Sequence, residues 1–368
     1  MPGSYRIIPI AALAILLIAV QVLLEVEMDG RSLSAQISLR SSTGGILRGG
    51  TPTRADICFI TFEFGPPGHP LEPLANLSRL GLRLPEAGES FQSNYTAPPR
   101  QSYPPPRNYR YVAFVNDPET DTGDWEKVIV EPDPRFIRPK TMASQFKFVA
   151  WQHPAMDSCR TIFPMDGTKF PVPEPAVWAD LEARIHSTPG GVLLQKKVYK
   201  RKVTALLDGL VSWQKDSPEF VNATKTWLLS RHDFDPGTVC LFTNFFGYDP
   251  ANQYYQEMSS EFWHYYSTEM LTARDQPLFS YFVDRHKEDL QPIYLKHFGY
   301  ESHKKDPDYE LLPYIDFCSE AKLNKKRKSG EEIDKTIIQI PTYFDPDLAT
   351  EICEKSQKHD FTGLQTFD

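Results

Sequence analysis

Two aspartates lie where an acid can bind a metal ion or a ligand. Asp117 and Asp166 each follow a short apolar run typical of a buried strand, and Gly167 comes directly after Asp166. In an α/β sheet, ligands bind at the carboxyl ends of the strands. A glycine there lets the chain turn or lets a ligand approach the backbone closely. The spacing therefore makes Asp166 the first candidate for a metal or ligand contact.

Each acid also has a purely structural interpretation. Asp-Gly at 166–167 and Asn116-Asp117-Pro118 are both turn-forming sequences. Asp275 precedes Pro277 at the start of an expected helix, where an aspartate caps the free N–H groups well. A turn, a cap and a functional carboxylate are all open interpretations at these positions.

The elements that must position these acids alternate along the chain. Strands are expected at 56–65, 109–117, 125–130, 160–165 and 239–246, with a strand or helix edge at 192–198; helices are expected at 138–149, 177–185, 202–214, 218–230, 253–270 and 274–286. Such alternation predicts an α/β domain with a mostly parallel sheet covered by helices.

The N-terminus predicts a membrane anchor. Residues 7–24 form an uninterrupted, mostly apolar run near the minimum length of a transmembrane helix. Arg6 precedes the run and acids follow it, which favours a cytosolic N-terminus and a lumenal body. A cleaved signal peptide is the alternative. The expected organisation is a cytosolic tail at 1–6, a signal anchor at 7–24, a flexible stem at 25–52, a lumenal domain at 53–315 and a charged extension at 316–368.

Glycosylation sequons and cysteines agree with a secretory address. Sequons begin at Asn76, Asn94 and Asn222. The chain has five cysteines, and an odd count leaves at least one outside an intramolecular disulfide. Cys58 and Cys159 lie in apolar strand-like runs, where a disulfide and a buried thiol are both open. A CxxC pair is absent from the sequence, so a zinc ribbon is not expected.

Charge and motifs exclude several classes. The net charge of −8 argues against general nucleic-acid binding. The sequence contains no GxSxG elbow, HExxH helix, P-loop or GxGxxG fingerprint. The most easily recognised types of hydrolase, zinc protease, kinase and dehydrogenase are therefore not expected.

What remains is an ordered series of short patterns, namely 111–117, Asp124-Trp125, 138–140, 147–151, 159–167, Arg231-His232, 261–263 and 274–277. In this order they resemble the lumenal glycosyltransferase-like proteins of plants and algae linked to cell-wall mucilage, and more broadly the GT-A nucleotide-sugar transferases. The resemblance covers roughly residues 55–285, and Asp166 with Arg274-Asp275-Gln276 are its most specific parts.

The resemblance implies a type II membrane glycosyltransferase of the Golgi or endoplasmic reticulum, with a hexosyltransferase as the expected class. Its GT-A-like, Rossmann-like domain would have a mixed, mostly parallel sheet. It would transfer a sugar from a nucleotide-sugar donor to a glycan or glycoprotein acceptor. A divalent ion, Mn²⁺ or Mg²⁺, would neutralise the diphosphate. Asp166 is the implied ligand, with His297 and His303 as candidates from position alone.

The remaining site residues follow from the same resemblance. Asp117 would lie near the nucleotide, Asp275 would serve as general base on the acceptor hydroxyl, and Glu261 is a second acid candidate. This chain departs from the family pattern at Met165-Asp166-Gly167, where one acid stands in place of two. A metal-independent enzyme would instead hold the phosphates with basic side chains; the candidates are Arg138, Lys140 and Lys147.

Two other functions remain open. One is a lumenal hydrolase of lipids or glycans, because a plant relative of this group is linked to ceramide cleavage. The other is a catalytically inactive binding protein with the same fold, which the single acid favours. For an active site, Asp117, Asp166 and Asp275 are expected to converge in one cleft.

Overall fold

The computed structural model describes the part of the chain between Pro52 and Asp368 in segments. These are residues 55–64, 109–131 except 121 and 124, 139–166, 169–171, 175–196, 201–268, 271–296 and 314–316, together with 325, 328–330 and 350. The predicted anchor and stem lie outside the described residues. Among the helices that are described, none is long and apolar enough to span a bilayer.

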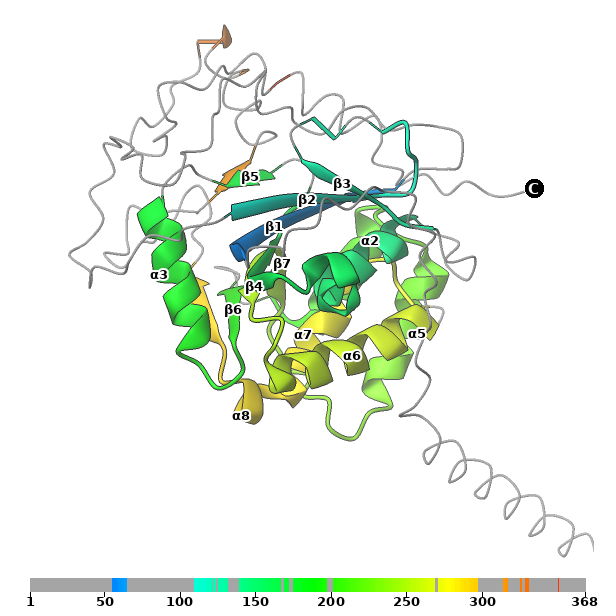
Figure 1. The fold of residues 1–368 in the computed structure, drawn as a ribbon. Coiled ribbons are helices and arrows are strands. Elements are labelled where there is room, and N and C mark those ends of the chain that lie inside the picture. Colours follow the sequence, from blue (N-terminus) through cyan, green and yellow to red (C-terminus); the bar gives the residue numbers. More distant parts are fainter. Residues whose placement is uncertain are drawn as a thin grey trace, which may run out of the picture. The chain divides into compact units, whose positions relative to one another are not determined.

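A mixed sheet forms the centre of the domain (Figure 1). In spatial order its strands are β3 (Glu126–Ile129), β2 (Tyr109–Val115), β1 (Ala55–Glu63), β4 (Cys159–Pro164), β7 (Leu241–Tyr248), β6 (Val192–Lys196) and β8 (Ile293–Lys296). Strands β3, β2, β1 and β4 are parallel, β7 is antiparallel to β4 and β6, and β8 is parallel to β6. The predicted mixed, mostly parallel sheet with flanking helices is confirmed.

Helices cover both faces of this sheet. They are α2 (Pro139–Phe148), α3 (Pro175–His186), α4 (Val203–Ser212), α5 (Pro218–Leu229), α6 (Gln253–Thr268), α7 (Asp275–Arg285) and α8 (Lys287–Leu290), with short turns η1 (Ala150–Gln152) and η2 (Pro154–Met156). Helix α2 packs on β1 and β4, and α7 packs on β7. Helix α3 packs on β6 from the other side of the sheet (Figure 1). A small second sheet pairs β5 (Lys169–Pro171) with β9 (Tyr314–Asp316).

Aromatic side chains fill the two interfaces between sheet and helices. On one face, Phe148 stacks on Phe246 and contacts the rings of Phe262 and Phe279, which joins α2, β7, α6 and α7. On the α3 face, Trp178 packs edge-on against Phe59 and Phe163. Alternate residues of a strand point to opposite faces, so the central strands are buried on both sides.

The order of the strands creates a switch point between β1 and β4. The chain proceeds from β1 to β2 and β3 on one side and then crosses to β4 on the other side of β1. Because β1 and β4 are parallel, their carboxyl ends lie at the same edge. Crevices at such switch points are the usual ligand sites of open α/β sheets. The topology therefore makes the residues that follow β4 the candidates for a ligand site.

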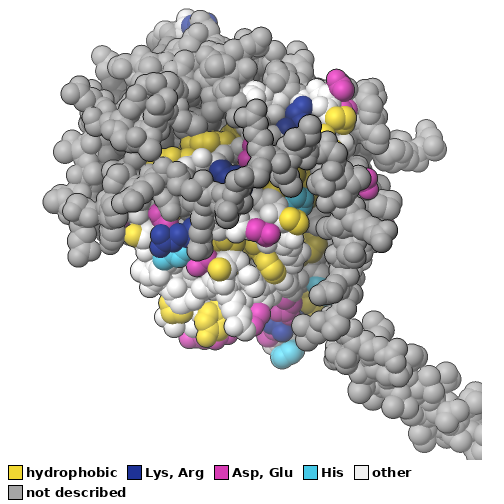
Figure 2. Space-filling model, viewed as in Figure 1, with side chains coloured by type: hydrophobic (Ala, Val, Ile, Leu, Met, Phe, Trp, Pro, Cys, Tyr) yellow, Lys and Arg dark blue, Asp and Glu magenta, His cyan; other side chains and the backbone are white. Residues whose placement is uncertain are grey.

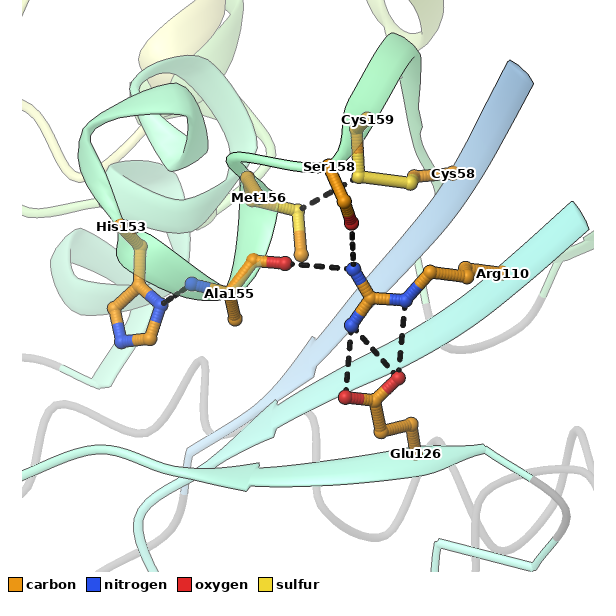
Figure 3. A network of polar contacts seen from close by, with 8 residues as sticks. All are labelled: Cys58, Arg110, Glu126, His153, Ala155, Met156, Ser158 and Cys159. Carbon is orange, nitrogen blue, oxygen red and sulfur yellow. Dashed lines mark hydrogen bonds and ion pairs between the residues drawn. A yellow bond between two sulfur atoms is a disulfide. The ribbon is translucent and has the colours of Figure 1, made fainter. Parts of the chain in front are cut away.

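The amino end of the same strands is fastened covalently (Figure 3). A disulfide links Cys58 of β1 to Cys159 of β4. Beside it, the Arg110 guanidinium pairs with Glu126 at 2.8 Å and donates to the Ser158 hydroxyl at 2.7 Å and to the Ala155 carbonyl at 2.8 Å. These contacts connect β2, β3 and the turn before β4 at the edge opposite the switch point.

Candidate functional site

Asp166 lies just beyond the carboxyl end of β4, at the switch point. Its predecessor Met165 continues the strand, since the Met165 N–H donates to the Ile60 carbonyl and Met165 bridges to Phe245 of β7. The Asp166 side chain is 34 % exposed. The sheet therefore brings this carboxylate to the predicted ligand edge and leaves one side of it open.

Two buried lysines hold the Asp166 carboxylate. Lys169 Nζ, from the start of β5, lies 2.8 Å from Oδ2, and Lys147 Nζ, near the end of α2, lies 3.4 Å from Oδ1. The two lysine side chains are only 4 % and 9 % exposed. The short contact with Lys169 has the length of a charge-assisted hydrogen bond, whereas the contact with Lys147 is longer. Lys169 thus fixes the carboxylate and Lys147 is held more loosely.

Lys147 also reaches Asp275, which opens α7. Its Nζ lies 3.3 Å from Asp275 Oδ2, while the Thr243 hydroxyl of β7 donates to Asp275 Oδ1 at 2.9 Å. Arg274 occupies the N-cap position, so Asp275 lies in the first turn of the helix instead of capping it. A carboxylate in a first turn is stabilised by the helix dipole. The structure thus brings together three predicted residues: Lys147, Asp166 and Asp275.

This group, which we call the lysine–aspartate cluster, comprises Lys147, Asp166, Lys169, Thr243 and Asp275. Burial alone would raise the pKa of the Asp166 carboxyl, but the ammonium groups of Lys147 and Lys169 outweigh burial and hold the pKa well below its ordinary range. Asp166 is therefore ionised throughout the physiological range. A carboxylate with so low a pKa is a weak general base and a good acceptor of hydrogen bonds from hydroxyl groups.

A divalent ion does not fit the described residues of the cluster. Both Asp166 oxygens already accept from lysine ammonium groups, and Asp275 is engaged by Lys147 and Thr243. Mn²⁺ and Mg²⁺ are held by carboxylate oxygens, whereas two ammonium groups beside one carboxylate repel a second cation. Within the described segments, no three His, Cys, Asp or Glu side chains form a metal-binding group. His297, the predicted second ligand, lies outside them, as does His303.

Asp117 lies at the same edge of the sheet without joining the cluster. Strand β1 separates β2 from β4, which puts roughly 10 Å between those two strands across the sheet. The register also places Asp117 three residues further along the strand direction than Asp166, which adds roughly another 10 Å between them. The Asp117 carboxylate accepts from the Glu119 N–H at 2.8 Å, and its carbonyl accepts from Thr120. The turn interpretation of Asp117 is confirmed, and a nucleotide contact there stays a prediction.

Glu261 belongs to α6 and lies beside the C-terminal end of α7. Its carboxylate contacts Arg285 and His286, each at 2.7 Å, at the C-terminal end of the helix that Asp275 opens. The helix has 11 residues and thus rises roughly 16 Å. Glu261 and Asp275 are therefore not brought into one site.

The other predicted phosphate contacts are not described. Arg138 and Gly167 lie outside the described residues, and only the backbone of Lys140 in α2 is described. Sequence reasoning missed Lys169 and Thr243. Lys169 had one local signal, its position three residues after Asp166, whereas Thr243 reaches Asp275 only through the tertiary fold.

A second arrangement has the connectivity of a nucleophile, a base and an orienting acid. The Thr161 hydroxyl lies 2.9 Å from His186 Nε2, and His186 Nδ1 lies 3.2 Å from Asp249 Oδ2. Hydrolytic triads are recognised by such contacts. Thr161 is fully buried within β4, however, so no substrate reaches its hydroxyl in this conformation. These contacts tie α3 to β4 and β7.

Charged side chains of the described residues are interspersed on the face shown in Figure 2, without a large patch of one sign. No protein-family model matches the chain. No curated protein matches it either.

Proposed function

We propose that the chain is a GT-A-like glycosyltransferase that moves a sugar from a nucleotide-sugar donor to a glycan or glycoprotein acceptor. The observation that carries the proposal is the meeting of Asp166 and Asp275 through Lys147 at the carboxyl edge of β4, beside the switch point. Nucleotide ligands bind at such switch points in open α/β sheets. Such a transfer needs groups that accept hydrogen bonds from sugar hydroxyls, positive charge for the phosphates and a base for the acceptor hydroxyl.

The cluster can supply these parts. Asp166, fixed as an anion, accepts hydrogen bonds from ribose or sugar hydroxyls on its exposed side. The loosely held Lys147 turns toward the donor diphosphate, whose negative charge competes with the two carboxylates. When Lys147 moves away, Asp275 Oδ2 is free to take the proton of the acceptor hydroxyl. Lys169 keeps Asp166 in place during this exchange.

The proposed cellular setting is the lumen of the Golgi or endoplasmic reticulum, with residues 7–24 as the membrane anchor. The disulfide between Cys58 and Cys159 supports an oxidising compartment, because such bonds are rare in the cytosol.

A donor screen tests the function. Full-length protein in detergent is assayed for hydrolysis or transfer of a panel of nucleotide sugars, with Mn²⁺, with Mg²⁺ and with a chelator. The same assays on Asp166→Ala and on Asp208→Ala, an exposed aspartate of α4, separate the site from general effects. We expect turnover of one donor class that falls at least about 100-fold in Asp166→Ala, as for loss of an essential positioned group. Turnover equal in wild type and Asp166→Ala contradicts the assignment.

A binding protein without catalysis is the second candidate. Within the described residues, the ammonium groups of the cluster face its two carboxylates. Nucleotide binding that depends on Asp166, combined with no turnover of any donor, supports this alternative. Turnover of a lipid or glycan substrate in place of a nucleotide sugar supports the hydrolase instead.

A further inference from the structure

The sequon at Asn222 lies on α5 with its two functional residues in opposite environments. Asn222 and Ala223 are exposed, whereas Thr224 is completely buried. The Thr224 hydroxyl donates to the Phe220 carbonyl at 2.8 Å and accepts from the Thr272 N–H at 2.7 Å. Within the described residues the Asn222 side chain makes no hydrogen bond, so none of their contacts requires its amide.

We infer that Asn222 carries an N-linked glycan and that this glycan is attached before α5 forms. The inference rests on the lumenal address in the proposed function and is independent of the catalytic reaction. The sequon needs both the amide of Asn222 and the hydroxyl of Thr224 at one enzyme site. In a helix, residues two apart do not face each other. The folded α5 therefore separates the two groups and engages the hydroxyl in the core.

The attachment balances as a simple transfer. The Asn222 side-chain nitrogen attacks the first sugar carbon of an oligosaccharide linked through diphosphate to a membrane lipid. A C–N bond forms, the bond from that carbon to the phosphate oxygen breaks, and the lipid diphosphate leaves while the amide loses one proton. The co-reactant is the lipid-linked oligosaccharide of the secretory pathway.

The folded structure accommodates the product. Asn222, Ala223 and Thr226 form an exposed strip of α5, so a glycan on Asn222 extends into solvent without displacing core residues. The core side of the same helix is held by Val221, Thr224 and Leu228. The glycan thus marks α5 as a face that stays open to solvent and is not buried against a partner.

The test uses the full chain expressed in a eukaryotic secretory cell. Peptide mass spectrometry reads the occupancy of Asn222, with Asn76 and Asn94 as reporters of lumenal entry. We expect a glycopeptide at Asn222 that Asn222→Gln lacks, with an unchanged melting temperature because Asn222 is exposed. Native treatment with a peptide N-glycosidase is expected to release the glycan and leave aspartate at position 222.

Pulse labelling tests the timing. We expect the Asn222 glycan on chains within the pulse and no further addition during the chase, after the Cys58–Cys159 disulfide has formed. A bare Asn222 on chains glycosylated at Asn76 or Asn94 overturns the site but not the lumenal address. Chains bare at every sequon, with reduced Cys58 and Cys159, overturn both. Addition during the chase on disulfide-bonded chains overturns the order of events.

Discussion

At the scale of single residues, the ion pairs of the lysine–aspartate cluster affect both the stability of the fold and the proposed reaction. Lys147 contacts two carboxylates at 3.3 and 3.4 Å, while Lys169 lies 2.8 Å from the Asp166 carboxylate. A buried ion pair adds little net stability, but removing one partner leaves the other charge buried without compensation. The two lysines are therefore expected to differ in what their loss does to Asp275.

Replacing Lys147 by Met tests this directly. The variant leaves the largely buried Asp275 without its cation, and we expect the free energy of unfolding to fall by about 3 kcal/mol. Urea unfolding followed by circular dichroism measures the change. Lys127→Met is the matched control, because Lys127 is an exposed lysine whose ammonium donates to the Pro118 carbonyl. Equal stability of both variants contradicts an energetic role of Lys147.

The low pKa of Asp166 predicts a pH dependence of stability with a defined sign. Its folded pKa lies below the unfolded value near 3.9, so between these values the unfolded chain binds more protons. The stabilisation is present above about pH 4 and is lost as the pH falls through the folded pKa. Burial would raise the pKa of Asp233, but the hydrogen bond from Tyr281 and the charge of Arg285 outweigh it and lower that pKa. The stabilisation from Asp233 is therefore also lost as the pH falls.

Unfolding in urea at pH 6, 4 and 3 separates the two contributions. Between pH 4 and pH 3 we expect a smaller decrease in the unfolding free energy of Asp166→Asn than of wild type, because the variant lacks this titration. Asp208→Asn, at an exposed site, is expected to follow the wild-type slope. Parallel curves for wild type and Asp166→Asn argue against a depressed pKa.

At the scale of elements, β7 and α7 complete a site that β4 begins. Strand β7 carries Thr243 to Asp275 and packs Phe245 on Phe163 of β4. Gly247 of β7 allows the close approach on the α3 side, where an added Cβ would lie 2.3 Å from the Phe163 ring and 2.9 Å from Ile185. The site thus depends on tight packing between β4, β7 and α3.

Gly247→Ala is expected to destabilise the domain by about 1–3 kcal/mol, the usual cost of overpacking a core. Thermal unfolding measures the shift. Gly209→Ala in α4 is the control, since its Cβ would meet only the side chain of the half-exposed Trp213, which can move, and alanine favours the helix. A Gly247 variant as stable as the Gly209 variant shows that the interface has room for a methyl group.

At the scale of the whole molecule, the disulfide joins parts of the chain far apart in sequence. Cys58 and Cys159 are 101 residues apart, so their bond restricts the unfolded chain over a long loop. In the chain-entropy view such a loop contributes about 4–5 kcal/mol. The bond also joins β1 and β4, the two strands on either side of the switch point.

The double variant Cys58→Ala/Cys159→Ala is therefore expected to lose about 4 kcal/mol of stability, most of it through the unfolded state. Denaturant unfolding of wild type with and without a reductant provides the parallel measurement. Reduction and the double substitution should give similar losses. A loss near zero in both indicates that the amino edge is held chiefly by the Arg110 contacts.

The sequence alone determined the elements and their class. Hydrophobic periodicity located β1, β2, β3, β4, β7 and the helices α2 to α7 near their observed bounds, because burial imposes a period on each element. It missed β5, β8, β9 and α8, which have three or four residues each and carry too little periodic signal. It also singled out Asp166, Asp275 and Lys147 as candidates.

Only the tertiary structure decided how these residues meet. The pairing of Cys58 with Cys159, the antiparallel direction of β7 and the contacts of Lys147 with both aspartates all depend on how distant segments pack side by side. Local patterns carry no information about that packing, because it joins segments that are far apart in the sequence. The same long-range packing placed Glu261 of α6 beside the C-terminal end of α7, whereas Asp275 lies at the start of α7, although the sequence had offered both as acids of one site.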